Sequence, residues 1–244
     1  MNAALLEKRQ NRYRQSKPAF LGRGIDRLTN PVGATLAGMV PNWIVEKVLN
    51  GIDRASARAP LGTFTHDRDD LAACIDAAEE VESTAKRLNA ASGAGAGFFG
   101  AITASADIPT TIGLALANIR DTGRAYGFDG IGDRERLFRL QILELAATPD
   151  RDSRQPLIDQ LMAGIETGGA LMPFTDKNIE PIVDQVVERV SRAVAFAAFR
   201  SRLGMVVPLV GSAVGGIVNA QFQGDVAKAA RFAFEARRLK ALEE

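Results

Sequence analysis

The chain has 244 residues and a formal net charge of +1, so it can bury a large core but has no overall field that would attract nucleic acid or a membrane. Only 6% of its residues are aromatic, whereas 23 are glycine, and this composition favours closely packed helices over a β-sandwich. A single cysteine excludes an internal disulfide and is typical of a reducing, cytoplasmic compartment.

Residues 1–30 form a basic arm, with seven basic and two acidic side chains and a local net charge of +5. Residues 3–16 within it are polar and helix-prone, and residues 17–40 hold enough proline and glycine to predict irregular structure. No apolar segment follows the basic residues, so we expect no secretory signal. The arm is interpreted either as a solvated amphipathic helix or as a contact for an anionic membrane surface or acidic partner.

Two helices are predicted next, separated by a break at Pro60 and Gly62. The first spans residues 41–52, where apolar side chains recur at helical spacing. The second spans residues 66–89, with Thr65 as the expected N-cap and an acid-rich first turn that suits the helix dipole. Its apolar stripe is predicted to face the core and consists of Leu71, Cys74, Ile75, Ala78, Val81, Ala85 and Leu88.

Two stretches carry no charged residue: 88–106, of 19 residues, and 203–224, of 22. Each is long enough to cross a bilayer, but each also repeats small residues every four positions, which lets helix backbones approach closely. Three alternatives stay open, namely a buried helical hairpin, shallow or reversible membrane insertion, and stable spanning. Pro109 and Pro208 weigh against a simple span. We expect the two stretches to be adjacent, closely packed helices of one core.

The first charge-free stretch contains a G-x-G-x-x-G pattern from Gly95 to Gly100, with Asp121 about 20 residues further on. This pattern binds a dinucleotide only when a strand leads into it, so that the pyrophosphate meets the start of a helix. Here a charged amphipathic helix is predicted before the pattern. We therefore exclude dinucleotide binding.

A further helix is predicted to start at Asp107-Ile108-Pro109, with Asp107 as its N-cap and Pro109 in its first turn. It should run to about Ala125 and end at Gly127. Asp107 is the one acid in an otherwise apolar neighbourhood, so a second interpretation makes it a general acid or base with a raised pKa.

The remaining predicted helices span residues 133–147, 154–167 and 178–203, and a last helical segment opens at Pro208. Alternation with a period of two residues never exceeds four residues, so no strand is predicted. The expected fold is therefore all-α, a single domain of seven to nine helices with the two glycine-rich helices in close contact.

No residue set matches a known catalytic, cofactor or metal chemistry. His66 is the only histidine, and Cys74 lies on the apolar face of its predicted helix, where core packing explains it. Basic and aromatic residues are not interleaved, which excludes a nucleic-acid surface. A polar cluster is interpreted as ion pairs around a turn and consists of Arg120, Asp121, Tyr126, Asp129, Asp133, Arg134 and Glu135.

The run from Ala106 to Asp129 resembles the signature of the EcsC protein family. In that family a glycine-rich segment precedes Ala-Asp-(apolar)-Pro, and an arginine-bearing helix leads to Tyr-Gly-(aromatic)-Asp. The corresponding residues here are Ala106-Asp107-Ile108-Pro109, Arg120 and Tyr126-Gly127-Phe128-Asp129. Later elements of the family are similar to Asp133-Arg134-Glu135-Arg136-Leu137-Phe138 and Pro208-Leu209-Val210-Gly211. The resemblance covers about 40–240, so we divide the chain into an arm, 1–30, and an EcsC-like domain, 31–244.

The resemblance implies an all-helical bacterial protein of poorly defined activity, in a family named for a protein encoded beside a bacterial ABC transporter. It transfers no catalytic residue, cofactor or metal ligand. It does emphasise six positions as a candidate functional cluster: Asp107, Pro109, Arg120, Tyr126, Gly127 and Asp129.

We expect a non-enzymatic accessory protein, membrane-peripheral or transport-associated, in the cytoplasm or on the inner face of the cell membrane. Its expected partner is an anionic membrane surface or a membrane transport complex, with the glycine-rich helices supplying apolar contact and the arm electrostatic contact. The alternative is an enzyme or small-molecule-binding protein with a polar pocket around Asp107, Arg120, Tyr126 and Asp129. A helical scaffold for protein interactions is a third interpretation.

Overall fold

The computed structural model describes residues 3–16, 55, 58–97, 101–148, 151–168, 187–188, 191 and 211–243. For residues 91–97, 101–109 and 211–220 it describes the path of the backbone only. The predicted helices at 41–52 and 178–203 lie outside the described residues, apart from 187, 188 and 191. The predicted boundary at residue 30 also lies outside them.

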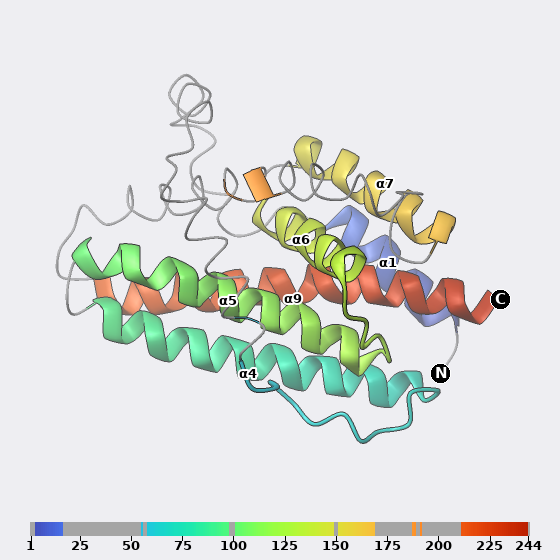
Figure 1. The fold of residues 1–244 in the computed structure, drawn as a ribbon, viewed down its shortest axis with the longest axis horizontal. Coiled ribbons are helices and arrows are strands. Elements are labelled where there is room, and N and C mark those ends of the chain that lie inside the picture. The colour runs from blue at the N-terminus through green and yellow to red at the C-terminus, as the bar shows by residue number, and fades with distance from the viewer. Residues whose placement is uncertain are drawn as a thin grey trace.

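Within these ranges helices are the only regular secondary structure and no strand is present, which confirms the all-α prediction (Figure 1). The count of seven to nine helices depends partly on residues outside these ranges. The helices described are α1 (Ala3–Gln15), α4 (Leu71–Gly97), α5 (Ala101–Ala125), α6 (Asp133–Ala147), α7 (Arg151–Gly168) and α9 (Gly211–Glu243).

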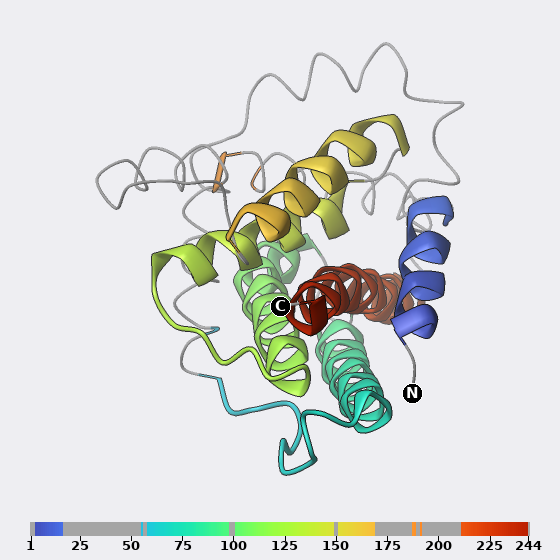
Figure 2. The ribbon, with the colours of Figure 1, turned by 90° about the vertical axis from the view of Figure 1, so that its right-hand side faces the viewer.

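The 33-residue helix α9 is the centre of the structure and packs against each of the other five described helices. Figure 2 looks along α9 and shows α4 and α5 beside it, α1 on another side, and α6 and α7 on a third. Small residues allow this crowding, since five alanines of α9 between Ala227 and Ala236 are buried. The bulkiest fully buried side chains are Tyr126, Phe138, Phe232 and Phe234.

Helix α4 begins at Leu71 rather than at residue 66, because Asp70 and not Thr65 caps it. The Asp70 carboxylate accepts hydrogen bonds from the backbone N–H groups of Ala72 and Ala73, at 2.8 and 3.4 Å. The helix then continues past the predicted end at residue 89, as far as Gly97. The predicted apolar stripe is buried except for Leu88, which is 43% exposed and was wrongly assigned to the core.

Helix α5 begins at Ala101, so the prediction that Asp107 is an N-cap is wrong. Asp107 and Pro109 both lie inside the helix. A proline inside a helix costs about 3 kcal/mol, and packing of α5 against α4 and α9 offsets that cost. The C-terminal end matches the prediction, since the helix stops at Ala125 and Gly127 has a φ of +87°.

The charge-free ends of α4, α5 and α9 lie side by side at one end of the bundle (Figure 1). A helix, not a strand, leads into the G-x-G-x-x-G pattern, because residues 95–97 are the last residues of α4. The side-chain packing predicted for the glycine-rich faces lies outside the described residues. Among the described helices, none combines the length and the apolar character that crossing a membrane requires.

Candidate functional site

The six emphasised residues do not meet at one place. Asp107 and Pro109 lie near the start of α5, and Arg120 lies near its end. Thirteen residues separate Asp107 from Arg120, which corresponds to roughly 20 Å along a straight helix. The side chains of Asp107 and Pro109 are outside the described part of the structure.

Arg120 belongs to a network centred on Asp121, whose side chain is completely buried. The Asp121 carboxylate accepts two hydrogen bonds from the Arg120 guanidinium, at 2.8 and 3.0 Å, and one from the backbone N–H of Leu61, at 2.8 Å. Arg120 also donates to the carbonyl oxygens of Ala55 and Arg58, at 2.9 and 3.2 Å. The network therefore fastens Ala55, Arg58 and Leu61 to α5, and these donors and acceptors are occupied by the fold itself.

Tyr126, which directly follows α5, belongs to a second network with Glu235 of α9 and Arg9 of α1. The Tyr126 hydroxyl and the Arg9 Nε–H both donate to Oε1 of Glu235, each at 2.8 Å. The Glu235 side chain is only 3% exposed. Burial raises the pKa of Glu235 against the opposing effect of Arg9, and burial followed by the Glu235 charge raises the pKa of Tyr126.

Asp129 lies at the half-exposed edge of the Asp121 network. It pairs with Arg124 at 2.8 Å and with Arg68 at 3.5 Å, and Arg124 also pairs with Asp121 at 3.2 Å. Gly127 is required for conformation, since its φ of +87° is unfavourable for other residues and an added Cβ would lie 3.2 Å from Arg68 Cδ. The interpretation of this region as ion pairs around a turn is confirmed for Arg120, Asp121, Asp129 and Glu135, the last of which pairs with Arg237 of α9 at 2.8 Å.

Two further predictions concern single residues. Cys74 is fully buried, as its place on the apolar face of α4 predicts. His66 donates a hydrogen bond from Nε2 to the carbonyl oxygen of Ala125, at 2.8 Å, and so satisfies the C-terminal end of α5. In the described residues, no three His, Cys, Asp or Glu side chains form a group that could hold a metal ion.

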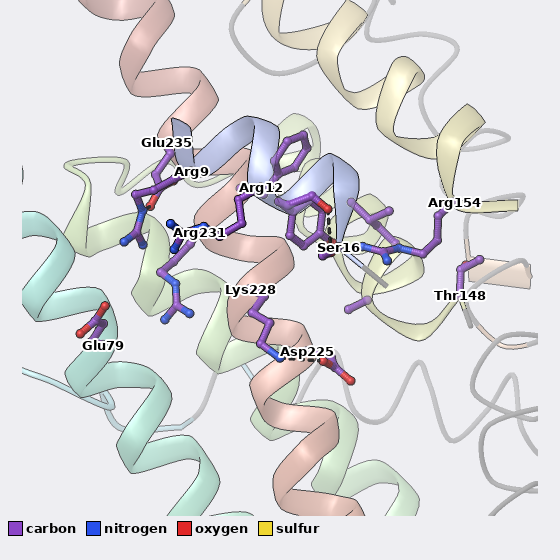
Figure 3. A pocket seen from close by; sticks show the side chains of 14 residues that line it. Arg9, Arg12, Ser16, Glu79, Thr148, Arg154, Asp225, Lys228, Arg231 and Glu235 are labelled. Carbon is purple, nitrogen blue, oxygen red and sulfur yellow. Dashed lines mark hydrogen bonds and ion pairs between the residues drawn. The ribbon is translucent and has the colours of Figure 1, made fainter. Parts of the chain in front are cut away.

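A different set of residues lines a cavity of about 510 Å³ where α1, α6, α7 and α9 meet beside α4 (Figure 3). Of the six emphasised residues, none with a described side chain lines it. The lining residues are Arg9, Arg12, Tyr13, Ser16, Glu79, Leu145, Ala146, Thr148, Arg154, Asp225, Lys228, Arg231, Phe232 and Glu235.

Five basic and three acidic side chains line this cavity. Some of its charges are already paired: Arg9 with Glu235, Lys228 with Asp225 at 3.2 Å, and Arg231 with Glu82 of α4. Arg12 and Arg154 have no carboxylate partner among the described residues. The cations left without a described carboxylate partner are therefore two arginines, one on α1 and one on α7, and Glu79 of α4 lines the same cavity.

The floor of the cavity is apolar and aromatic. The rings of Tyr13 and Phe232 stack with their centroids 4.5 Å apart, and Leu145 and Ala146 are buried beside them. The Arg154 guanidinium lies over the Tyr13 ring, 5.0 Å from its centroid, although Arg154 is only 8% exposed. A cavity of this size with cationic walls and an apolar floor suits an anionic ligand that has an apolar part.

Sequence reasoning identified the basic arm but missed this cavity, because its walls are far apart in the chain. Arg12 and Arg154 are separated by more than 140 residues, and neither belongs to a motif. Glu235 left one local signal, since it is the only acid in the apolar run from Phe232 to Ala236 and such an acid needs a buried partner.

A family model and one curated relative of this chain carry the same family name. A family model described as EcsC protein family matches residues 4–239, and so includes α1, whereas the motifs indicated residues 40–240. Protein EcsC of Bacillus subtilis (strain 168) is 26% identical over 226 residues, which cover 92% of this chain and 89% of that protein. Uncharacterized protein YdbA of the same strain is 31% identical over 134 residues, covering 53% of this chain and 48% of that protein. No solved structure matches the chain.

Proposed function

This chain belongs to the EcsC protein family, and we propose that it acts as a non-enzymatic accessory protein that binds an anionic membrane surface peripherally, on the cytoplasmic side. The basic face around the cavity supplies the electrostatic contact. The charge-free ends of α4, α5 and α9 supply a shallow apolar contact in the same proposal.

The observation that carries this proposal is the position of α1. This basic helix is docked on α9, with Leu6 fully buried and Gln10 donating to the carbonyl oxygen of Phe232 at 2.8 Å. Docking places Arg9 and Arg12 beside Lys228 and Arg231, so cations from the two ends of the chain form one preorganised surface. Arg12 and Lys228 are the exposed members of this set, and each would contribute about 1 kcal/mol of attraction near an anionic leaflet, without the ordering cost of a free arm.

Vesicle sedimentation tests the proposal. The protein should sediment with vesicles of mixed phosphatidylglycerol and phosphatidylcholine but not with pure phosphatidylcholine, and added salt should release it because salt screens exposed charges. The double variant Arg12→Gln and Lys228→Gln should sediment several-fold less. A matched control, Arg87→Gln and Arg136→Gln, removes two exposed charges outside the cavity and should bind like the parent protein.

Protein that stays in the supernatant with anionic vesicles at low salt overturns the membrane proposal. If the same protein sediments with native membranes, a membrane transport complex becomes the better partner.

The alternative of a small-molecule pocket around Asp107, Arg120, Tyr126 and Asp129 receives less support from the geometry. Arg120 and Asp129 belong to one ion-pair network that Arg124 joins, Tyr126 belongs to another, and Asp107 lies about 20 Å from Arg120 along α5. The cavity on the α1 face is the better candidate for a small ligand.

A further inference from the structure

We propose that the cavity between α1, α7 and α9 is a binding site for a phosphate monoester, with Arg154 as the main contact to the phosphate group and Arg12 as the second cation. The inference rests on the proposed function only where the phosphate belongs to a lipid headgroup. Glycerol 3-phosphate and phosphatidic acid share the phosphate monoester group, and phosphatidic acid also carries an apolar part.

Arg154 is a nearly buried cation at the wall of the cavity. Its side chain lines the cavity, yet the residue is only 8% exposed and no carboxylate pairs with it in the described part of the chain. Its observed contact is the Tyr13 ring, which neutralises no charge. A buried guanidinium without a counter-charge is costly, so an anion that enters the cavity would find a favourable partner.

The residues that line the cavity carry more positive than negative charge. Arg9, Arg231 and Lys228 have carboxylate partners in the structure, whereas Arg12 and Arg154 have none among the described residues. Glu79 also lines the cavity, so the five basic and three acidic lining residues together with Glu82 carry a net charge of +1. A phosphate monoester carries between one and a half and two negative charges near pH 7 and so offsets this excess.

Arg154 and Arg12 approach the cavity from different helices, α7 and α1. Figure 3 shows Arg154 extending from α7 toward α1, where Ser16 lies, while Arg12 lies on the side of Arg9 and Arg231. The planar fork of an arginine donates two parallel hydrogen bonds to phosphate oxygens. With the phosphate at Arg154, the apolar remainder of the ligand would lie along the stacked rings of Tyr13 and Phe232.

Calorimetric titration of the full chain with glycerol 3-phosphate tests the inference. We expect saturable binding, at least tenfold weaker in Arg154→Gln and about two- to threefold weaker in Arg12→Gln. Arg154→Lys should also bind weakly, because it keeps the charge but loses the fork. The exposed control Arg136→Gln should bind like the parent protein.

Vesicles containing phosphatidic acid distinguish the two sources of the phosphate group. Sedimentation that depends on Arg154 with phosphatidic acid, but not with the diester phosphatidylglycerol, assigns the site to a lipid headgroup. Binding of glycerol 3-phosphate alone assigns it to a soluble ligand. The inference is overturned if neither glycerol 3-phosphate nor phosphatidic acid binds, or if a folded Arg154→Gln variant binds them as well as the parent protein does. Salt-sensitive binding to phosphatidylglycerol vesicles would then still support the proposed function.

Arg12→Gln keeps the test decisive if the substitutions of Arg154 unfold the protein, because Arg12 is exposed. Phosphate affinity that does not change at all in Arg12→Gln contradicts the assignment of Arg12 as the second cation.

Discussion

At the scale of single residues, Glu235 is a buried side chain that can carry a charge. Its carboxylate lies between Tyr126 and Arg9 and is 3% exposed. Burial raises its pKa above the ordinary value of 4.5, and this effect exceeds the opposing effects of Arg9 and the Tyr126 hydrogen bond. The folded protein therefore holds the Glu235 proton more tightly than the unfolded chain does.

The first prediction at this scale concerns pH. Because the folded-state pKa is raised, Glu235 stabilises the fold most below pH 4.5, and this contribution is lost as the pH rises through the folded-state pKa. Glu235→Gln lacks this titration, so the free energy of unfolding of the parent protein minus that of the variant should fall as the pH rises from about 4.5. Denaturant unfolding of both proteins between pH 4 and 8 measures the difference, and a difference that rises with pH contradicts the assignment.

A second prediction concerns Gly123, which lies against Phe234 of α9. A Cβ at Gly123 would lie 2.7 Å from Phe234 Cζ and 3.2 Å from the carbonyl oxygen of Phe128. Gly123→Ala should lower the free energy of unfolding by about 1–3 kcal/mol, since the ring and the turn must both move. Gly62→Ala is the control, because its Cβ would meet Val81 at an ordinary 3.4 Å, and chemical denaturation should place it within about 1 kcal/mol of the parent. Equal stability of the two variants would contradict the crowding at Gly123.

At the scale of elements, the network around Asp121 joins a segment without regular structure to a helix. Asp121 is completely buried and satisfies both Arg120 and the backbone N–H of Leu61. Asp121→Asn removes the counter-charge of Arg120, which is itself only 12% exposed, so we expect a loss of about 3–5 kcal/mol. The amide of Leu61 should then exchange its hydrogen faster, which hydrogen-exchange mass spectrometry detects.

The matched control at this scale is Asp129→Asn. Asp129 also pairs with arginines, but it is 51% exposed, so its loss should cost less than about 1 kcal/mol and leave Leu61 protected. If the two variants lose similar amounts of unfolding free energy, the burial of Asp121 does not raise the cost of removing its charge.

Individual elements also show which parts of the fold local sequence determines. The limits of α6, 133–147, were predicted correctly, since its acidic first turn and Thr148 are local signals. The start of α5 was not, because Asp107 and Pro109 are local start signals that packing against α4 and α9 overrides. The local sequence therefore predicts a helix end when a cap or a turn determines it. It does not predict a helix end that long-range packing determines.

At the scale of the whole molecule, the candidate site was the least predictable feature. The basic character of α1 was visible in the sequence, but its position against α9 was not, because the pairs Arg9–Glu235 and Gln10–Phe232 link residues more than 220 positions apart. Arg154, the residue most important to the proposed site, showed no pattern in the sequence. Its significance arises only when α7 approaches α1 and Tyr13 lies beneath its guanidinium.

The packing of α1 against α9 also determines when, during synthesis of the chain, the fold can be completed. Helix α1 leaves the ribosome first, but Leu6, Gln10 and Tyr13 must wait until α9 has been made before they find their partners. Contacts of such large sequence separation form late and slowly, because a long loop must close first. Until then the central helix is missing from the bundle, and a nascent chain of this design depends on protection of its apolar faces from other chains.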